Sequence, residues 1–259
     1  MITLDTPGPV FGLSREARPG DVPWNAATAL LALAVAVVGV LLLVLALGLS
    51  GAGSAEGMDG ATSAGALSAL VSVIIVDGWF VGVAWWHSLR RFALSAASWG
   101  FRPFERHSLL LVPVALVLAY LAGVVYTSLY SRLLGPPPEQ TILRDFPRNA
   151  PGVALFAITA IVVAPLLEET FFRGFLFQGL ARSWGPVWGA IVSAGLFGLA
   201  HQQASVFVPL FALGLLLAWV FYRSGSIWTN ILLHASFNGV SVLVWAAFGA
   251  VPALRLPMF

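Results

Sequence analysis

Long apolar segments alternate with short polar loops along the 259-residue chain. About 20 helical residues cross the hydrocarbon core of a bilayer, and backbone polar groups in lipid must be paired within a helix or a closed barrel. The segments are continuously apolar rather than alternating, which excludes a barrel. The pattern therefore predicts an all-α, polytopic transmembrane helix bundle. We expect about seven spans, over residues 24–49, 65–87, 108–134, 152–180, 187–203, 206–222 and 226–248.

These spans divide the chain into a polar N-terminal tail (1–23), N-terminal transmembrane helices (24–150) and a C-terminal transmembrane core (151–250). The tail lacks the basic start and short apolar region of a cleaved signal peptide, so we expect the first span to act as its own signal. The sequence shows no C-terminal lipidation motif, so we expect no lipid anchor there. It also shows no internal repeat, and we expect no second domain.

The composition agrees with a membrane protein and excludes several other classes. Charged residues make up 9% of the chain, whereas about a quarter is usual in soluble domains. A net charge of +2 is not the dense basic face of a nucleic-acid binder. The absence of cysteine excludes disulfides, thiolate metal ligands and a cysteine nucleophile.

Arginine is the basic residue throughout, and its distribution among the loops predicts the orientation. With the N-terminus in the cytoplasm, eight arginines lie inside and four outside, which favours this orientation. The inner set is Arg15, Arg18, Arg90, Arg91, Arg102, Arg106, Arg182 and Arg223, and the outer set is Arg132, Arg144, Arg148 and Arg255. The composition, with no Lys or Cys and abundant Ala, Gly and Arg, suggests a bacterial protein, so we expect a multi-pass protein of a bacterial plasma membrane.

Ionisable side chains inside spans are costly and commonly mark a site. The fourth span carries Glu168-Glu169-x-x-x-Arg173. On a helix, Glu169 and Arg173 share a face and can pair. Glu168 lies about 100° away around the helix, so it can point into a cavity and act as a base. Solvated charges at a helix end are the alternative, and the apolar residues on both sides weaken it.

Two further patterns are Phe197-x-x-x-His201 and His234-x-x-x-Asn238. His201 is near the end of its span and could equally be an interfacial histidine. His234 and Asn238 face the same way within the last span, where a helix–helix hydrogen bond is the alternative role.

Taken together, these residues supply the groups for peptide hydrolysis by water. A carboxylate assisted by an imidazole can take a proton from water, and a histidine with an asparagine amide can donate to the oxyanion that forms. Ser193 and Ser236 stand in no motif that would supply a serine nucleophile with a base.

The ordered patterns EExxxR, FxxxH and HxxxN, within about residues 150–245, resemble the CAAX protease and bacteriocin-processing (CPBP) family, relatives of the prenyl-protein type II CAAX endopeptidases. The resemblance implies an intramembrane endopeptidase whose active site is formed by the last four spans. Its substrate would be a peptide or protein in or at the lipid bilayer, with prenylated CAAX-type peptides among the candidates.

The resemblance also implies a role for each residue of the motifs. Glu168 would activate water with help from His201, and His234 with Asn238 would stabilise the oxyanion. Glu169 and Arg173 would form a supporting ion pair, and Phe197 would serve in packing.

A metal-free glutamic mechanism, with no cofactor, is the expectation. A zinc centre at Glu168, His201 and His234 is the lesser alternative, because two histidines and a glutamate can bind catalytic zinc but the chain contains no HExxH motif.

Two other functions are compatible with the same residues. A catalytically silent relative could act in bacteriocin self-immunity or peptide binding, and a transporter could use buried carboxylates, although it would predict inverted repeats that the chain lacks. Asp77, inside the second span, has no place in the motifs, and a structural role is expected for it. Gly185-x-x-x-Gly189 could pack helices within one chain or between two, so the sequence does not define the oligomeric state.

Overall fold

The structure of the chain, a computed structural model, describes residues 19–49, 63–135 and 150–248. These residues form helices and loops and contain no β-strand. Six of their helices are long and apolar enough to cross a membrane. The predicted all-α polytopic bundle is therefore confirmed. The tail up to residue 18, most of the loops 50–64 and 135–151, and Arg15, Arg18, Arg144, Arg148 and Arg255 lie outside the described residues.

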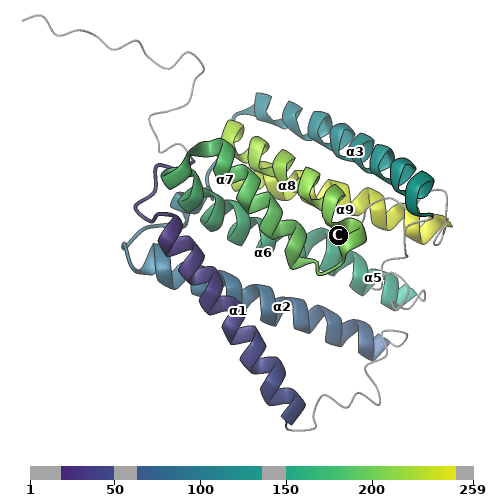
Figure 1. Cartoon of the computed structure of the whole chain (residues 1–259), viewed down its shortest axis with the longest axis horizontal. Helices are drawn as coiled ribbons and strands as arrows, with labels where there is room; N and C mark the ends of the chain where they lie inside the picture. Colours follow the sequence, from purple (N-terminus) through teal and green to yellow (C-terminus); the bar gives the residue numbers. More distant parts are fainter. Residues whose placement is uncertain (1–18, 50–62, 136–149, 249–259) are drawn as a thin grey trace, which may run out of the picture.

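The α-helices fall close to the predicted spans (Figure 1). Their bounds are α1 Ala26–Leu49, α2 Ser63–Trp85, α3 Leu111–Leu134, α5 Ala150–Ile158, α6 Ala164–Glu169, α7 Gln178–Ala200, α8 Ala204–Ser224 and α9 Ile227–Phe248. Short π-helical segments are η1 Trp86–Arg90, η4 Thr159–Val163 and η5 Thr170–Phe177, and 3-10 segments are η2 Ala96–Trp99 and η3 Arg106–Leu110.

The fourth membrane-length helix runs from Pro151 to Ala200 and contains both the fourth and fifth predicted spans. Gly185 interrupts it with φ 79° and ψ 164°, a conformation that glycine adopts far more readily than other residues. Beyond this bend the chain runs back along itself. The Ser193 hydroxyl donates to the Phe172 carbonyl at 3.2 Å, and the Phe172 and Phe197 rings meet edge-on at 5.2 Å. The predicted boundary between these two spans is thus a bend inside α7.

The helix that carries the glutamates is not regular. The six-residue α6 lies between the π-helical segments η4 and η5. At the start of each segment a threonine hydroxyl bonds to the carbonyl four residues earlier: Thr159 to Leu155 at 2.8 Å, and Thr170 to Leu166 at 2.7 Å. Such bonds compete with the backbone ladder and often bend helices. Wider turns on both sides therefore set the direction in which Glu168 and Glu169 project.

Close helix packing around α7 depends on small residues and aromatic rings. Gly214 of α8 lies so near Ala194 that an added Cβ would approach its Cα to 2.9 Å. The Trp24 indole donates to the Phe175 carbonyl at 3.0 Å, which ties the start of α1 to η5.

The far half of α1 is exposed, including Leu41, Leu45 and Leu49. An apolar exposed surface of this kind is expected of a helix that faces lipid.

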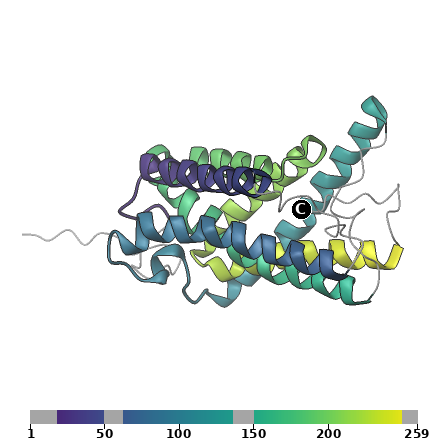
Figure 2. The same cartoon turned by 90° about the horizontal axis from the view of Figure 1, so that it is seen from below.

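α3 lies against α8 and α9 and extends past them at an oblique angle, as the teal helix in Figure 2 shows. The Tyr120 hydroxyl of α3 donates to the Phe237 carbonyl of α9 at 2.7 Å, and the two rings stack at 4.9 Å. Leu133, near the end of α3, is 79% exposed. α3 thus covers the side of the bundle where α9 carries His234 and Asn238.

Arginine-bearing loops meet at one end of the bundle. Arg102 donates to the Gly225 carbonyl, and its own carbonyl accepts from the Ser226 hydroxyl at 2.6 Å. The Ile227 amide donates to the Gly100 carbonyl at 2.8 Å. Arg182, beside the bend in α7, bonds to the Val22 carbonyl before α1. The loop after η1, the α8–α9 turn and the bend in α7 therefore share one face of the membrane protein.

Candidate active site

Glu169 is the centre of a buried polar network. One carboxylate oxygen accepts from Arg173 Nη1 at 3.0 Å and from His234 Nδ1 at 2.9 Å, and the other accepts from Asn230 Nδ2 at 3.2 Å. The side chains of Glu169, Arg173 and His234 are fully buried, at 0% exposure. A buried charge is tolerated only when it is paired and hydrogen-bonded. Arg173 supplies the opposite charge that pairs with Glu169.

Further bonds fix this network to α8. Arg173 Nη2 donates to the Gly214 carbonyl at 3.1 Å, and Asn230 Nδ2 donates to the Leu217 carbonyl at 2.7 Å. The guanidinium of Arg173 also stacks over the Phe197 ring, with 4.6 Å between Cζ and the ring centroid. The predicted ion pair of Glu169 and Arg173 is therefore present, and it ties together η5, α8 and α9.

Asn230 is the member of the network that the sequence motifs missed. It precedes His234 by four residues, as His234 precedes Asn238, so all three lie on one face of α9. That spacing was a signal that could have identified it. The bond from His234 to Glu169 joins two separate helices, and no local spacing could have revealed it.

The hydrogen bonds determine which nitrogen of each histidine carries a proton. The Glu169 carboxylate, which is paired with arginine, can only accept a hydrogen bond, and so can a backbone carbonyl. Nδ1 of His234 therefore donates to Glu169, and Nδ1 of His201 donates to the Phe197 carbonyl at 2.9 Å. In the neutral rings, Nε2 is then the acceptor. Nε2 of His234 is buried and has no hydrogen-bond partner among the described residues.

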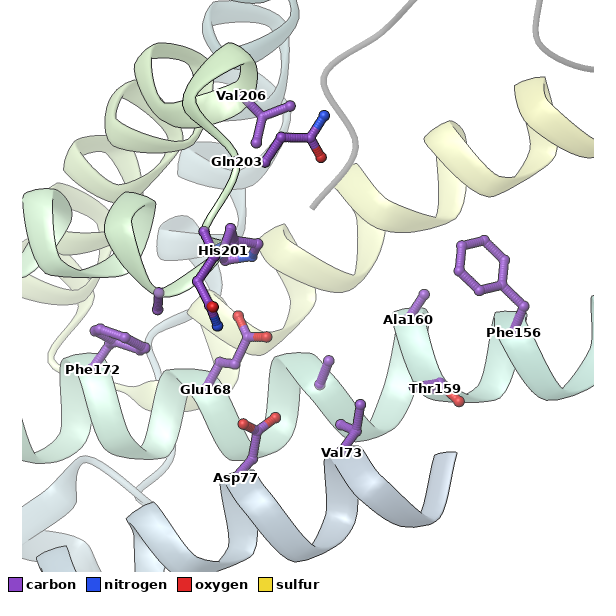
Figure 3. Close-up of a pocket in the computed structure, with 13 residues that line it drawn as sticks. Val73, Asp77, Phe156, Thr159, Ala160, Glu168, Phe172, His201, Gln203 and Val206 are labelled. Carbon is purple, nitrogen blue, oxygen red and sulfur yellow. The ribbon is translucent and has the colours of Figure 1, made fainter. Parts of the chain in front are cut away.

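A cavity of about 480 Å³ lies beside this network. Figure 3 shows Glu168 projecting from α6 toward the loop that carries His201, while Asp77 projects toward Glu168 from α2. Oε2 of Glu168 is buried without a hydrogen-bond partner in the described structure. Polar groups of the cavity wall are Asp77, Thr159, Glu168, His201, Gln202 and Gln203. Glu168 and His201 thus line the same cavity.

His234 and Asn238 lie behind this wall rather than in it. Both are fully buried, and neither is among the residues that line the cavity. Asn238 Nδ2 donates to the carbonyl of Ala160, a wall residue, at 2.7 Å. The Phe197 ring separates the two histidines, with centroids 4.9 Å from His201 and 5.8 Å from His234. Phe197 therefore packs between the two halves of the candidate site.

The zinc alternative requires three ligands around one point. Among the described residues, no group of three His, Asp or Glu side chains is arranged to hold a metal ion. The present arrangement does not fit a centre at Glu168, His201 and His234.

Fold and site define a class: a polytopic helical membrane protein with a neutralised carboxylate network beside a cavity that holds free carboxyl groups. Residues 150–240 match the family described as "Type II CAAX prenyl endopeptidase Rce1-like". The resemblance to the CAAX-type protease family is therefore confirmed over this part of the chain.

Parts of the chain are also similar to individual bacterial proteins. The chain is 31% identical over 129 residues to an Escherichia coli protein named "Uncharacterized 24.3 kDa protein", covering 47% of this chain and 59% of the relative. It is 28% identical over 93 residues to the Bacillus subtilis protein "Putative membrane peptidase YdiL", covering 36% of this chain and 38% of the relative. The B. subtilis protein YyaK is 26% identical over 133 residues, with coverage of 45% and 44%.

These similarities are partial. The chain spans about half the length of the curated relatives that it matches. No solved structure matches it significantly.

Proposed function

We propose that this chain is an intramembrane endopeptidase that hydrolyses peptide bonds of membrane-associated substrates with a glutamate-activated water. The observation that carries the proposal is the different environment of two adjacent carboxylates. Glu169 is neutralised by Arg173, whereas Glu168 faces a cavity together with His201 and keeps a buried oxygen without a partner. A free carboxylate next to a space for water is what a general base needs.

In the proposed first step, a water molecule in the cavity transfers a proton to Glu168 as its oxygen attacks the peptide carbonyl carbon. Nε2 of His201, the acceptor of the neutral ring, orients the same water. The carbonyl π bond opens, and negative charge develops on the carbonyl oxygen. The tetrahedral intermediate then collapses as the carbon–nitrogen bond breaks and the leaving nitrogen takes up a proton.

His234 and Asn238 are proposed to stabilise the oxyanion once the substrate displaces the part of the cavity wall that covers them. Asn238 retains a second amide N–H beyond the one that it donates to Ala160. His234 can donate from Nε2 only as an imidazolium, since Nδ1 already donates to Glu169, and the Glu169 carboxylate would stabilise that cation. Buried donors of this kind contribute most strongly because they are already oriented before charge develops.

We further propose the location, the partners and the cofactor requirement of the protein. The protein acts in a bacterial plasma membrane with its N-terminus in the cytoplasm, and its partners are the bilayer and a peptide or protein substrate, with prenylated CAAX-type peptides among the candidates. It needs no metal and binds no nucleic acid.

Cleavage of a membrane-peptide library by purified protein in detergent or nanodiscs tests this function. We expect cleavage by wild type, and a loss of about a hundredfold or more for Glu168→Ala and for His234→Ala. Failure of wild type to cleave any peptide, or cleavage at wild-type rates by both variants, would contradict the proposal.

Treatment with a chelator separates the two mechanisms in the same assay. The metal-free mechanism predicts unchanged cleavage after chelation and dialysis. Loss of activity that added zinc restores would instead support the zinc centre at Glu168, His201 and His234.

A further inference from the structure

Asp77 lies in the cavity wall opposite Glu168, although it belongs to no motif. It projects from α2 toward α6, and Figure 3 shows it beside Glu168. Asp77 and Glu168 are close enough to interact electrostatically. The two residues are 91 positions apart in the sequence, and the packing of α2 against α6 brings them together.

Neither carboxyl group has a cation of its own. The arginine that acts on Glu168, Arg173, is paired with Glu169. The charged groups that act on Glu168 are Asp77, Glu169 and Arg173, and His201 lies across the cavity. No ion pair or hydrogen bond of Asp77 is present in the described structure. One arginine therefore serves three carboxyl groups.

Two carboxyl groups that line the same low-dielectric cavity and share no cation ionise together only at a large electrostatic cost, so we expect the pair to hold one proton. Full ionisation here would leave a net charge of −2 on Asp77, Glu168, Glu169 and Arg173 together. One shared proton reduces that charge to −1.

The pair also stands at the junction of two cavities. The second cavity, also about 480 Å³, is lined by Asp77 and Glu168 together with apolar side chains of α1 and α2 such as Leu33, Val37 and Phe80. The first contains the polar side chains Thr159, His201 and Gln203. The carboxyl pair can therefore meet water from the polar side and an apolar peptide from the other.

We propose that Asp77 is a further catalytic residue, the second carboxyl of a proton-sharing pair with Glu168. The proposal rests on the proposed peptidase function for its catalytic step, but not for the pairing itself. At the start, Glu168 is the carboxylate and Asp77 the acid.

Water gives its oxygen to the carbonyl carbon and one proton to Glu168. When the carbon–nitrogen bond breaks, Asp77 gives its proton to the leaving nitrogen, which departs as an amine. Glu168 and Asp77 are then left with one proton between them, as at the start, and the new carboxyl terminus is released.

Infrared spectroscopy of the purified full chain tests the pairing without any substrate. In wild type at pH 7 we expect the C=O stretch of one protonated carboxyl group within the protein interior. The band should disappear in Asp77→Asn and also in Glu168→Gln, because a lone carboxyl has no partner with which to share. Ser72→Ala, on the same helix but outside the cavity wall, should keep the band and serves as the control for folding.

If the band persists in Asp77→Asn and is lost in Glu168→Gln, the proton belongs to Glu168 alone and the pairing is wrong. Absence of the band from wild type at pH 7 would also overturn it. Loss in both variants supports the pair even if no substrate is ever cleaved, which separates this test from the test of the peptidase function.

The catalytic part is tested by cleavage rates. We expect Asp77→Asn to lower kcat by about a hundredfold, a general-acid contribution, with little change in KM. Asp77→Glu should recover part of the rate, because it restores the acid. Equal kcat values for wild type and Asp77→Asn would overturn the catalytic role, while leaving Glu168 as the proposed base.

Discussion

Glu168 and Glu169 are adjacent in sequence and have opposite surroundings. Glu169 accepts hydrogen bonds from Arg173, His234 and Asn230 and is fully buried. Glu168 faces the cavity. Removal of one partner from a buried ion pair leaves an uncompensated charge in the protein. Removal of an unpaired buried carboxylate instead eliminates an uncompensated charge.

This contrast predicts different stabilities for two matched variants. Glu169→Gln should destabilise the protein by about 3–5 kcal/mol, because Arg173 remains charged and buried. Glu168→Gln should retain the wild-type stability or exceed it. Thermal unfolding in detergent, followed by tryptophan fluorescence, measures both. A lower melting temperature for Glu168→Gln than for Glu169→Gln would contradict this description of the network.

Spacing along single helices predicted part of the site. Glu169 with Arg173, and His234 with Asn238, are four residues apart, so their shared faces follow from helix geometry. The bond from His234 to Glu169 and the approach of Asp77 to Glu168 depend on how helices pack, and sequence spacing carries no information on that. For the same reason, the burial of His234 and Asn238 behind the cavity wall was not predictable.

At the scale of elements, the bend in α7 brings His201 back alongside the glutamates. The Gly185-Pro186 dipeptide is a breaker that the sequence reveals, and the predicted spans end and begin on either side of it. The π-helical segments around α6 leave no such signal, since they arise where threonine hydroxyls and packing displace the regular ladder. The directions of the two glutamates therefore needed the structure.

Two glycines on the returning arm of α7 offer a matched pair of variants. A Cβ at Gly189 would lie 2.8 Å from the backbone nitrogen of Ala181, whereas a Cβ at Gly195 meets nothing within 4 Å. Gly189→Ala should therefore destabilise the protein by about 1–3 kcal/mol through overpacking. Gly195→Ala should be neutral or slightly stabilising, since alanine is the better helix former. Equal melting temperatures of the two variants would mean that the arms do not pack this closely.

For the whole molecule, the chain is a multi-pass membrane protein in which the arginine-bearing loops share one end. His201, Gln202 and Gln203, at the cavity, follow the opposite end of α7. Arginine excess in short loops marks the cytoplasmic side. The cavity is then expected to lie in the outer half of the membrane, a conclusion that neither the loops nor the motifs could provide separately.

Labelling of introduced cysteines tests this orientation, and the chain has no cysteine of its own to interfere. Ala97 in the arginine-rich loop region and Ala204 near the cavity are both exposed. A membrane-impermeant maleimide should label Ala204→Cys in intact cells and Ala97→Cys only after permeabilisation. The reverse pattern would mean that the N-terminus and the arginine-rich end face outward.

The proposed function depends on the cavity carboxylate Glu168, which would activate water for peptide hydrolysis. The most direct measurement is the cleavage rate of one membrane-peptide substrate by wild type, Glu168→Gln and, as a control for carboxylate removal away from the cavity, Glu105→Gln. We predict a loss of about a hundredfold to ten-thousandfold for Glu168→Gln with unchanged folding, and wild-type rates for Glu105→Gln. A Glu168→Gln protein that cleaves the substrate as fast as wild type would contradict the account.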